Sequence, residues 1–367
     1  MLANMKRMHI TIGLSGGVDS SVAAWFLKKQ GHKVDAIFMK NWDDETNGAC
    51  NSKEDFLSAA VAAEKLDIPL EHVSFSEEYK KAVFNDFLEE YANGKTPNPD
   101  VFCNSEIKFK AFLNYSKKLG SEVIATGHYA QSQKAKNQQY NLIKALDCKK
   151  DQTYFLYRLS QKQLAGAMFP IGHLVKGQVR RIAKDLDLPN ADRKDSMGIC
   201  FIGNGQFKSF ISKYIKPKPG YICDESGEVI GEHQGLHYYT VGQRKGLGIG
   251  GRKLYNSNNV FAGKPWFVVK KDLKENRLIV VQGSKHPSLY VKIINASALH
   301  WISGCEPKIG EILQIKIRHG ELQVNAKVLS CDKVLSVEPE LPVWGVAPGQ
   351  SLVLYQGNIC LGGGIIT

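Results

Sequence analysis

Short apolar runs alternate with amphipathic segments along the first half of the chain. Four runs of β-branched and aliphatic residues predict buried strands, at residues 9–14, 34–39, 70–75 and 123–126. The other segments have apolar residues at helical spacing and predict helices, at residues 22–29, 55–66, 77–91 and 108–119. Such alternation favours a parallel sheet covered on both faces. We therefore expect an α/β fold whose ligands lie beyond the carboxyl ends of the strands.

The second half of the chain has a different pattern. The sequence KPKPG at residues 216–220 interrupts it, and glycine-rich turns with short strands follow. Five later apolar segments at regular spacing predict a small β-barrel, at residues 291–295, 312–317, 322–329, 334–337 and 351–355. We expect an N-terminal catalytic domain of residues 1–203, a small central linking domain of residues 204–285 and a C-terminal β-barrel of residues 286–367.

Composition narrows the class of protein. The 367 residues are 43% hydrophobic, enough for sizeable cores, and no segment supplies the roughly 20 apolar residues that span a bilayer. The formal charge of +12 favours a polyanionic partner, although simple solubility explains it equally well. Eight scattered cysteines without a Cys-x-x-Cys pair argue against a zinc ribbon and favour a reducing compartment. We expect a soluble, unexported, cytoplasmic protein.

The first predicted strand leads into the sequence SGGVDSS at residues 15–21, and a helix follows. Glycines free the backbone there, so successive N–H groups can form an anion-binding nest. Ser15 and Ser20 add hydroxyl donors, and Asp19 could help to hold Mg²⁺, but no lysine follows as in a Walker A loop. A helix cap made by Asp19 or Ser20 would explain one residue and not the glycine pair. The loop therefore indicates phosphate binding.

Two cysteines stand in segments that suggest chemistry. In TPNPDVFCN, residues 96–104, two prolines predict a stiff extended loop that carries Asp100 and Cys103 together. A lone cysteine is more often a small buried hydrophobe, and Asn-Pro-Asp is often a turn. The second cysteine, Cys200, stands in the glycine-flanked sequence DSMGICFIG at the expected domain junction. The pair gives each cysteine more weight than it has alone.

The SGGVDS sequence resembles the loop of pyrophosphatase-loop ATPases, which cleave between the α and β phosphates. Taken in order, SGGVDSS, TPNPDVFCN, ATGHYA, KDQTYFL, DSMGICFIG, GQRKGLGIGG and APGQS with CLGGGII resemble tRNA-specific 2-thiouridylases of the MnmA type, nearly from end to end. This resemblance implies an N-terminal domain like the adenine nucleotide alpha hydrolases, a linking domain and a β-barrel that contacts tRNA.

The resemblance also implies roles for individual residues. Cys103 would be the catalytic nucleophile, Cys200 the persulfide carrier, and Asp100 a general acid or base. ATP would be bound by Gly13, Leu14, Ser15, Gly16, Gly17, Val18, Asp19, Ser20, Met39 and Gly127. The target base and the tRNA would be contacted by Asn98, Pro99, Asp100, His128, Lys150, Asp151, Gln152, Arg318, His319 and Gln350. The chain departs from the family at Met197, often Thr, and at His319, often aromatic, which leaves base stacking there open.

The activity implied is ATP-dependent 2-thiolation of the wobble uridine of tRNA, which yields AMP and pyrophosphate, with Mg²⁺ accompanying ATP. The C2 oxygen of uracil is a poor leaving group, so adenylation would activate it before a Cys200 persulfide attacks C2. Cys103 would then attack the persulfide bond, leaving a disulfide between Cys103 and Cys200. Alternatively, Cys103 would release hydrogen sulfide, which would attack C2.

Partners and alternatives complete the expectations. The family implies lysine, glutamate and glutamine tRNAs. We expect a cysteine desulfurase or a sulfur relay protein as sulfur donor, and a monomer without a membrane partner. A tRNA lysidine synthetase or an argininosuccinate synthetase would share the ATP loop but need no pair of reactive thiols. A 4-thiouridine synthetase would carry an RNA-binding domain ahead of its ATP loop, which here begins at Gly13. A nonenzymatic RNA-binding protein would bind tRNA without releasing pyrophosphate.

Overall fold

A five-stranded parallel sheet forms the centre of the N-terminal domain in the computed structural model, which describes residues 7–42, 52–194, 206–249, 263–320 and 322–367. The strands are β1 (His9–Gly13), β2 (Lys33–Lys40), β3 (Leu70–Ser74), β4 (Val123–Ala125) and β7 (Ala167–Met168). Their order is β3-β2-β1-β4-β7, so the direction of winding reverses at β1. Ligands of parallel sheets bind at such a reversal, here beyond the carboxyl ends of β1 and β4. The four predicted strands and the α/β fold are confirmed.

Helices cover both faces of this sheet, because successive residues of a strand point to opposite sides. Ala36 and Phe38 of β2 pack into one apolar core, and Ile37 between them packs into another. The first core is closed by α1 (Val18–Lys29), α2 (Ser52–Lys65) and α8 (Lys176–Asp185). The second is closed by α3 (Ser76–Tyr79), η1 (Lys80–Phe84), α4 (Asn85–Ala92), α5 (Pro99–Phe102), η2 (Cys103–Ala111) and α6 (Phe112–Lys118).

One predicted loop is helical instead. The extended conformation expected over residues 96–104 ends at Asn98, because Pro99 begins α5 and the helix continues through the π-helical segment η2 into α6. Proline suits the first helical position, since the N–H it lacks would be unpaired there and its fixed φ matches a helix. Asp100 and Cys103 are therefore presented by a helix start and not by a loop.

The central domain is a four-stranded sheet in the order β10-β11-β8-β9. Its strands are β8 (Gly220–Cys223), β9 (Val229–His233), β10 (Trp266–Asp272) and β11 (Arg277–Gln282). The short helix η4 (Leu236–Tyr238) packs against it, whereas the preceding helix α9 (Phe207–Ile211) packs Phe210 and Ile211 into a core of the N-terminal domain. The end of α4 reaches this domain, since a Cβ on Gly94 would lie 2.7 Å from a methyl group of Leu273.

The C-terminal strands close into a six-stranded barrel in the order β13-β16-β15-β14-β18-β19, with β19 pairing back onto β13. They are β13 (Ile294–Trp301), β14 (Ile312–Lys316), β15 (Val324–Cys331), β16 (Leu335–Pro339), β18 (Ser351–Gln356) and β19 (Ile359–Ile366). The predicted barrel is confirmed, but apolar spacing did not predict β19. Glycines at 362–364 interrupt its apolar pattern, and they are needed because Cβ atoms there would collide with neighbouring strands.

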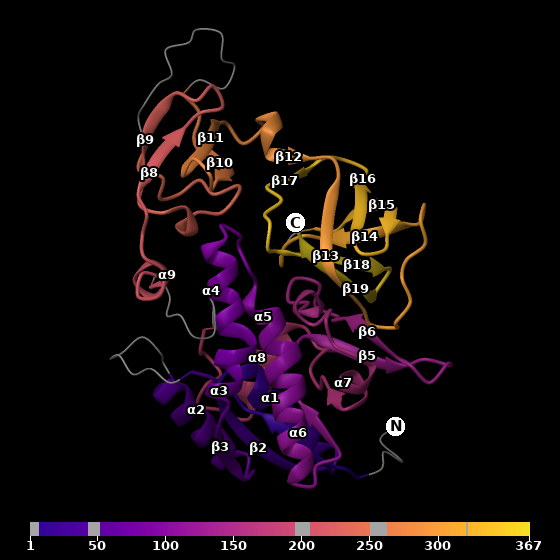
Figure 1. Ribbon diagram of the computed structural model, residues 1–367. Helices are drawn as coiled ribbons and strands as arrows, with labels where there is room; N and C mark the ends of the chain where they lie inside the picture. The colour runs from indigo at the N-terminus through magenta and orange to yellow at the C-terminus, as the bar shows by residue number, and fades with distance from the viewer. Residues whose placement is uncertain (1–6, 43–51, 195–205, 250–262, 321) are drawn as a thin grey trace.

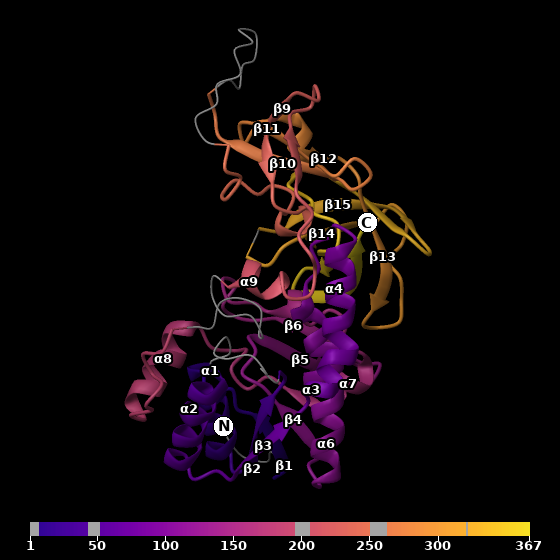
Figure 2. The ribbon, with the colours of Figure 1, turned by 60° about the vertical axis from the view of Figure 1, so that its left-hand side comes forward.

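The N-terminal domain and the barrel share one continuous sheet. The hairpin of β5 (Ala130–Lys134) and β6 (Tyr140–Lys144) follows β4, and β6 pairs with the first residues of β19. Figures 1 and 2 show this hairpin between the parallel-sheet domain and the barrel, with the central domain at the far end of α4. The remaining elements are η3 (Thr153–Phe155), α7 (Gln161–Ala165), η5 (Pro287–Leu289), β12 (Tyr290–Val291) and β17 (Val343–Trp344). Within the described ranges, every helix is too short or too polar to cross a bilayer.

Candidate active site

The loop between β1 and α1 is fixed by contacts to its backbone. Gly16 has a φ of +78°, and a Cβ there would collide with the carbonyl oxygen of Asp55. The Gly16 carbonyl accepts hydrogen bonds from Ser58 Oγ at 2.8 Å and from Asn190 Nδ2 at 2.9 Å. Arg193 also donates to this carbonyl, at 3.3 Å, and its guanidinium pairs with the Asp55 carboxylate. Glycine is required at position 16, and the loop is held in shape from two sides.

Serine hydroxyls line the same loop. Ser20 Oγ donates to the Gly17 carbonyl at 2.9 Å and accepts from the Ser15 N–H at 3.2 Å. Ser15 Oγ lies 3.2 Å from Ser20 Oγ, and Ser15 is exposed. Gly17 precedes the first turn of α1, whose unpaired N–H groups carry partial positive charge. Hydroxyl donors beside a helix N-terminus suit a phosphate group.

The structure brings the predicted nucleotide residues of three strand ends together. A Cβ on Gly13 would lie 2.8 Å from Met39 Cε, at the end of β2. A Cβ on Gly127 would lie 2.6 Å from the backbone nitrogen of Ser20, so Gly127 lets the segment after β4 lie against the start of α1. Leu14 and Val18 are buried, so their side chains do not face a ligand, and the Leu14 N–H donates to the Ile37 carbonyl oxygen at 2.9 Å.

A lysine that the loop lacks in sequence reaches it in space. Lys176 Nζ, at the start of α8, lies 2.8 Å from each carboxylate oxygen of Asp19. The hydroxyl of Tyr129 donates to the same Asp19 Oδ1, also at 2.8 Å. The Lys176 and Asp19 side chains are 12% and 28% exposed, so the ion pair is partly shielded from water. Sequence analysis missed Lys176 and Tyr129, which are 157 and 110 residues from Asp19. Lys176 stands in none of the motifs, and Tyr129 stands in ATGHYA, where nothing in the sequence shows that it faces Asp19.

These residues fit the triphosphate of ATP. The loop offers backbone N–H groups and two hydroxyls, and Lys176 and Arg193 supply positive charge at its edge. Asn190 Oδ1 is buried without a hydrogen-bond partner among the described residues, beside the amide nitrogen that holds Gly16. Asp19 is the carboxylate of the loop that could ligate Mg²⁺, provided that Lys176 moves off it.

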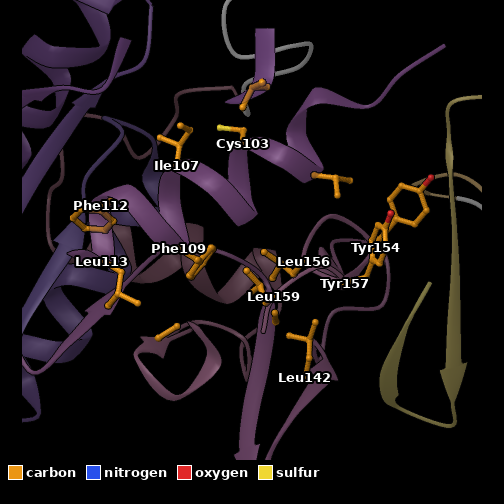
Figure 3. Packing of buried hydrophobic residues seen from close by; sticks show 14 of the residues in the cluster. Cys103, Ile107, Phe109, Phe112, Leu113, Leu142, Tyr154, Leu156, Tyr157 and Leu159 are labelled. Atoms are coloured by element: carbon orange, nitrogen blue, oxygen red, sulfur yellow. The ribbon is translucent and has the colours of Figure 1, made fainter. Parts of the chain in front are cut away.

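Cys103 stands at the junction between α5 and η2. It is 1% exposed and belongs to the same apolar core as Ile107, Phe109 and the partly buried Met39. Figure 3 shows it one turn before Ile107 on the same helical segment. Asp100 precedes it by three residues, a spacing that puts two side chains on one face of a helix. Helical geometry thus supports the expectation that Asp100 and Cys103 lie together.

The other predicted reactive thiol, Cys200, lies outside the described residues. The described cysteines include two that burial makes poor nucleophiles. Burial raises the pKa of the Cys360 thiol strongly, and it raises the pKa of Cys331 to about 11. Both thiols are therefore protonated at neutral pH.

Two of the predicted tRNA segments contact each other. The exposed ring of His319, which follows β14, lies with Nε2 3.2 Å from the carbonyl oxygen of Asp151. The Asp151 carboxylate is buried and faces Lys316 Nζ at 3.4 Å, so it is not available to a large ligand. Gln152 accepts a hydrogen bond from the Tyr129 N–H through Oε1, at 2.8 Å. Residues 150–152 thus lie between the barrel and the end of β4.

His128 is half-buried in the segment after β4. Its Nδ1 lies 2.8 Å from Thr126 Oγ1, and its ring packs on Phe109 and Phe169. Burial, together with the positive charge of Lys108, holds the pKa of His128 well below its usual range. The imidazole is therefore neutral at physiological pH.

The remaining tRNA candidates lie where the three domains meet. Gln350 Nε2 donates to the carbonyl oxygen of Thr96 at 2.7 Å, and Thr96 Oγ1 lies 3.2 Å from Thr240 Oγ1 of the central domain. Arg318 donates to the carbonyl oxygens of Val241 and Gly345. A cavity of about 190 Å³ opens beside this junction, and Asn98, Pro99, Phe102, Gly349 and Ile365 are among its lining residues. The junction thus joins Asn98 and Pro99 to Gln350.

Comparison with family models divides the chain into three matched parts. Residues 8–204 match a tRNA methyl transferase HUP domain, residues 208–282 a tRNA methyl transferase PRC-barrel domain, and residues 291–366 an aminomethyltransferase β-barrel domain. A solved structure of the U34-tRNA thiolase NcsA from Methanococcus maripaludis aligns with 56% of this chain and 63% of its own, at 21% identity and a TM-score of 0.35. A TM-score this low supports no conclusion about the fold or the function of this chain.

Full-length relatives are more informative. A protein from Nitrosomonas eutropha is 51% identical over 365 residues, which are 99% of each chain, and it is named tRNA-specific 2-thiouridylase MnmA. A protein of the same name from Methylobacillus flagellatus is 51% identical over 368 residues, again 99% of each chain. Half-identical sequence from end to end, over all three matched parts, shows that the chain belongs to the MnmA family of tRNA-specific 2-thiouridylases.

Proposed function

We propose that the chain thiolates C2 of the wobble uridine of tRNA, after adenylating the C2 oxygen with ATP. Family membership supports the enzyme class, a tRNA-uridine 2-sulfurtransferase. The observation that carries the ATP step is the phosphate loop, where Ser15, Gly16 and Ser20 meet Gly127 and the ammonium of Lys176 beside Asp19. Backbone donors and a nearby cation are what a departing pyrophosphate requires.

Activation precedes sulfur transfer, because the C2 oxygen of uracil leaves poorly. The C2 oxygen attacks the α-phosphorus of ATP, the bond to the β-phosphate breaks and pyrophosphate leaves. The loop N–H groups and Lys176 stabilise the negative charge that moves onto the leaving group. Mg²⁺ bound with the nucleotide would add charge neutralisation, with Asp19 as its ligand from this chain.

Sulfur transfer then uses the two thiols. The terminal sulfur of a Cys200 persulfide attacks C2, and the AMP that carries the former C2 oxygen leaves. The Cys103 thiolate attacks the Cys200 sulfur, so a disulfide forms between the two cysteines and the sulfur stays on C2. A thiol reductant must reduce this disulfide before the next turnover. Alternatively, Cys103 attacks the persulfide first, and the hydrogen sulfide released attacks C2.

Asp100 is the proton carrier in this scheme. Its position one helical turn before Cys103 supports this assignment, since a carboxylate at that spacing can accept the thiol proton. Asn98 and Pro99 precede it and line the cavity at the domain junction, which supports a place for them beside the target base. The base would have to leave its stack, which costs little in an anticodon loop.

The tRNA body would lie across the barrel side of the molecule. The proposed contacts are Lys150, Gln152, Arg318, His319 and Gln350. Four of them lie between the N-terminal domain and the barrel, and Arg318 lies between the barrel and the central domain, which supports this assignment. Asp151, being buried, would act by holding the segment. We extend the proposal to lysine, glutamate and glutamine tRNAs, to a monomer in the cytoplasm and to a cysteine desulfurase or relay protein as sulfur donor.

The nucleotide products test the ATP step. Incubation with tRNA and ATP should yield AMP and pyrophosphate in equal amounts, and ADP as sole product would refute adenylation. Cys200→Ser should abolish thiolation while tRNA-dependent pyrophosphate release persists. Loss of both activities in a folded variant would show that Cys200 is wrongly assigned.

Cys360 offers a matched control for Cys103, because both are 1% exposed and belong to the same apolar core. Cys103→Ser should abolish formation of 2-thiouridine, measured by mass spectrometry of tRNA nucleosides. Cys360→Ser should retain thiolation, since Cys360 lies on β19 opposite Leu142 of β6 and not on the helical segment that carries Asp100. An equal loss of 2-thiouridine formation in both variants would show that Cys103 contributes only to packing.

A further inference from the structure

Asp19 is held by two side chains that are anchored to one short segment, residues 147–152. Lys176, which pairs with Asp19, donates its backbone N–H to Asp147 Oδ2 at 2.9 Å. Tyr129, whose hydroxyl reaches Asp19, exchanges two hydrogen bonds with Gln152, each 2.8 Å. Both partners of the loop carboxylate are therefore hydrogen-bonded to this segment.

The same segment is fastened to the β-barrel. The Asp151 carboxylate faces Lys316 Nζ of β14 at 3.4 Å, and both residues are buried. The Asp151 carbonyl oxygen lies 3.2 Å from Nε2 of His319, which follows the last residue of β14 by three positions. Thr153 Oγ1 adds hydrogen bonds to both Asp151 carboxylate oxygens and lies 3.3 Å from Tyr355 Oη of β18. A shift of the barrel must move residues 147–152.

Tyr129 continues this connection into the phosphate loop. It is 2% exposed, so its ring is held by packing, and its hydroxyl lies 2.8 Å from Asp19 Oδ1. Lys176 Nζ lies 5.9 Å from the centre of the same ring. The barrel, residues 147–152, Tyr129 and Asp19 thus form one unbroken series of contacts. Lys149 and Lys150 of the segment carry positive charge toward any RNA bound there.

The ion pair between Lys176 and Asp19 is closed in the structure, and a bound nucleotide would require it to open. While the pair is closed, the ammonium neutralises the carboxylate, and neither group can serve a nucleotide fully. When it opens, Lys176 can turn to a phosphate oxygen and Asp19 to the accompanying cation. The balance between the two depends on where Tyr129 and the start of α8 hold the groups.

We infer that Tyr129 is a positioning residue that couples RNA contact at residues 147–152 and the barrel to the phosphate loop. RNA bound there favours the open arrangement of Asp19 and Lys176. Each of the two ligands, tRNA and nucleotide, therefore binds more tightly to the enzyme that already holds the other than to the free enzyme. This coupling rests on the proposed use of ATP at the loop. Because linkage is reciprocal, it is measurable as a change in nucleotide affinity without any reaction.

The test measures the dissociation constant of α,β-methylene ATP with Mg²⁺, by titration calorimetry, with and without a saturating lysine tRNA transcript. In the full-length protein, tRNA should lower this constant by about fivefold or more. Tyr129→Phe keeps the ring and removes the hydroxyl, and tRNA should then change it by less than about twofold. Tyr129→Phe should bind tRNA alone with the same affinity as the unaltered protein. A variant with a loosened fold would bind tRNA more weakly, so this measurement separates loss of coupling from loss of structure.

Tyr140→Phe is the matched control, since it removes a tyrosine hydroxyl from β6, the strand paired with the β5 that Tyr129 precedes, and it should keep the full effect of tRNA. Persistence of the full effect in Tyr129→Phe would overturn the inference. So would an unaltered protein that binds the nucleotide equally well with and without tRNA. An unaltered protein that binds no nucleotide in either condition would instead defeat the proposed function, and the inference with it.

Discussion

Lys176 Nζ lies 2.8 Å from both carboxylate oxygens of Asp19, although the two residues are 157 positions apart. Asp19 belongs to a phosphate loop without a lysine of its own, and α8 supplies one from the other end of the domain. The fold thus restores a positive charge that many phosphate loops carry in sequence. Its partly shielded position makes that charge more effective than one exposed to solvent.

Removal of the Lys176 charge should slow pyrophosphate release. We expect Lys176→Met to lower the single-turnover rate by about 100-fold, because a preorganised donor to the leaving group is lost. Lys176→Arg should recover part of this rate, since it keeps the charge. Lys65→Met is the control: its pair with Asp187 is of similar length, 3.0 Å, but exposed. An equal effect at Lys65 would contradict a specific role for Lys176.

A side chain at position 127 should damage the nucleotide site. A Cβ there would lie 2.6 Å from the Ser20 backbone nitrogen, so Gly127→Ala must push the segment after β4 away from α1. We expect the dissociation constant for ATP to rise at least about tenfold, equivalent to about 1.4 kcal/mol. Gly177→Ala, where the added methyl group meets nothing within 4 Å, should leave ATP binding unchanged. Titration calorimetry on both variants checks the difference.

Stability should fall with acid partly because of His128. Its folded pKa is well below that of the unfolded chain, about 6.5, so the unfolded state binds the proton more readily. Its contribution is fully present above pH 6.5 and is lost as the pH falls below that value. Between pH 6.5 and 5, the unfolding free energy of His128→Gln should therefore fall less steeply with pH than that of the unaltered protein. The two slopes should differ by up to about 1.4 kcal/mol per pH unit. Urea unfolding at several pH values measures the unfolding free energy of both proteins. An equal dependence of this free energy on pH in the two proteins would contradict the prediction.

The buried pair of Lys316 and Asp151 should matter for the junction between domains. Lys316→Met leaves the Asp151 carboxylate, which is 3% exposed, without its cation, and we expect a loss of about 3 to 5 kcal/mol in unfolding free energy. Adding Asp151→Asn removes the uncompensated charge and should recover a large part of that loss. A double-mutant cycle by urea denaturation measures the coupling, and simple additivity would show that the pair contributes little.

The sequence by itself determined the parallel-sheet domain and most of the barrel, because burial on one or both faces leaves a pattern of period 2 or 3.6 that short segments record. It also singled out the Gly16-Gly17 pair, of which Gly16 requires glycine because its φ is positive and its backbone is crowded by Asp55. The motif resemblance led to the right family, which full-length relatives confirm.

Only the tertiary structure decided where distant groups meet. It placed Lys176 and Tyr129 on Asp19, joined residues 147–152 to both the barrel and the phosphate loop, and recruited the glycine-rich β19 into the barrel. It also made Pro99 a helix start, although the local sequence allowed a stiff loop equally well. Such contacts depend on which surfaces pack together. Packing sums small contributions over the whole chain, and no single segment records the result.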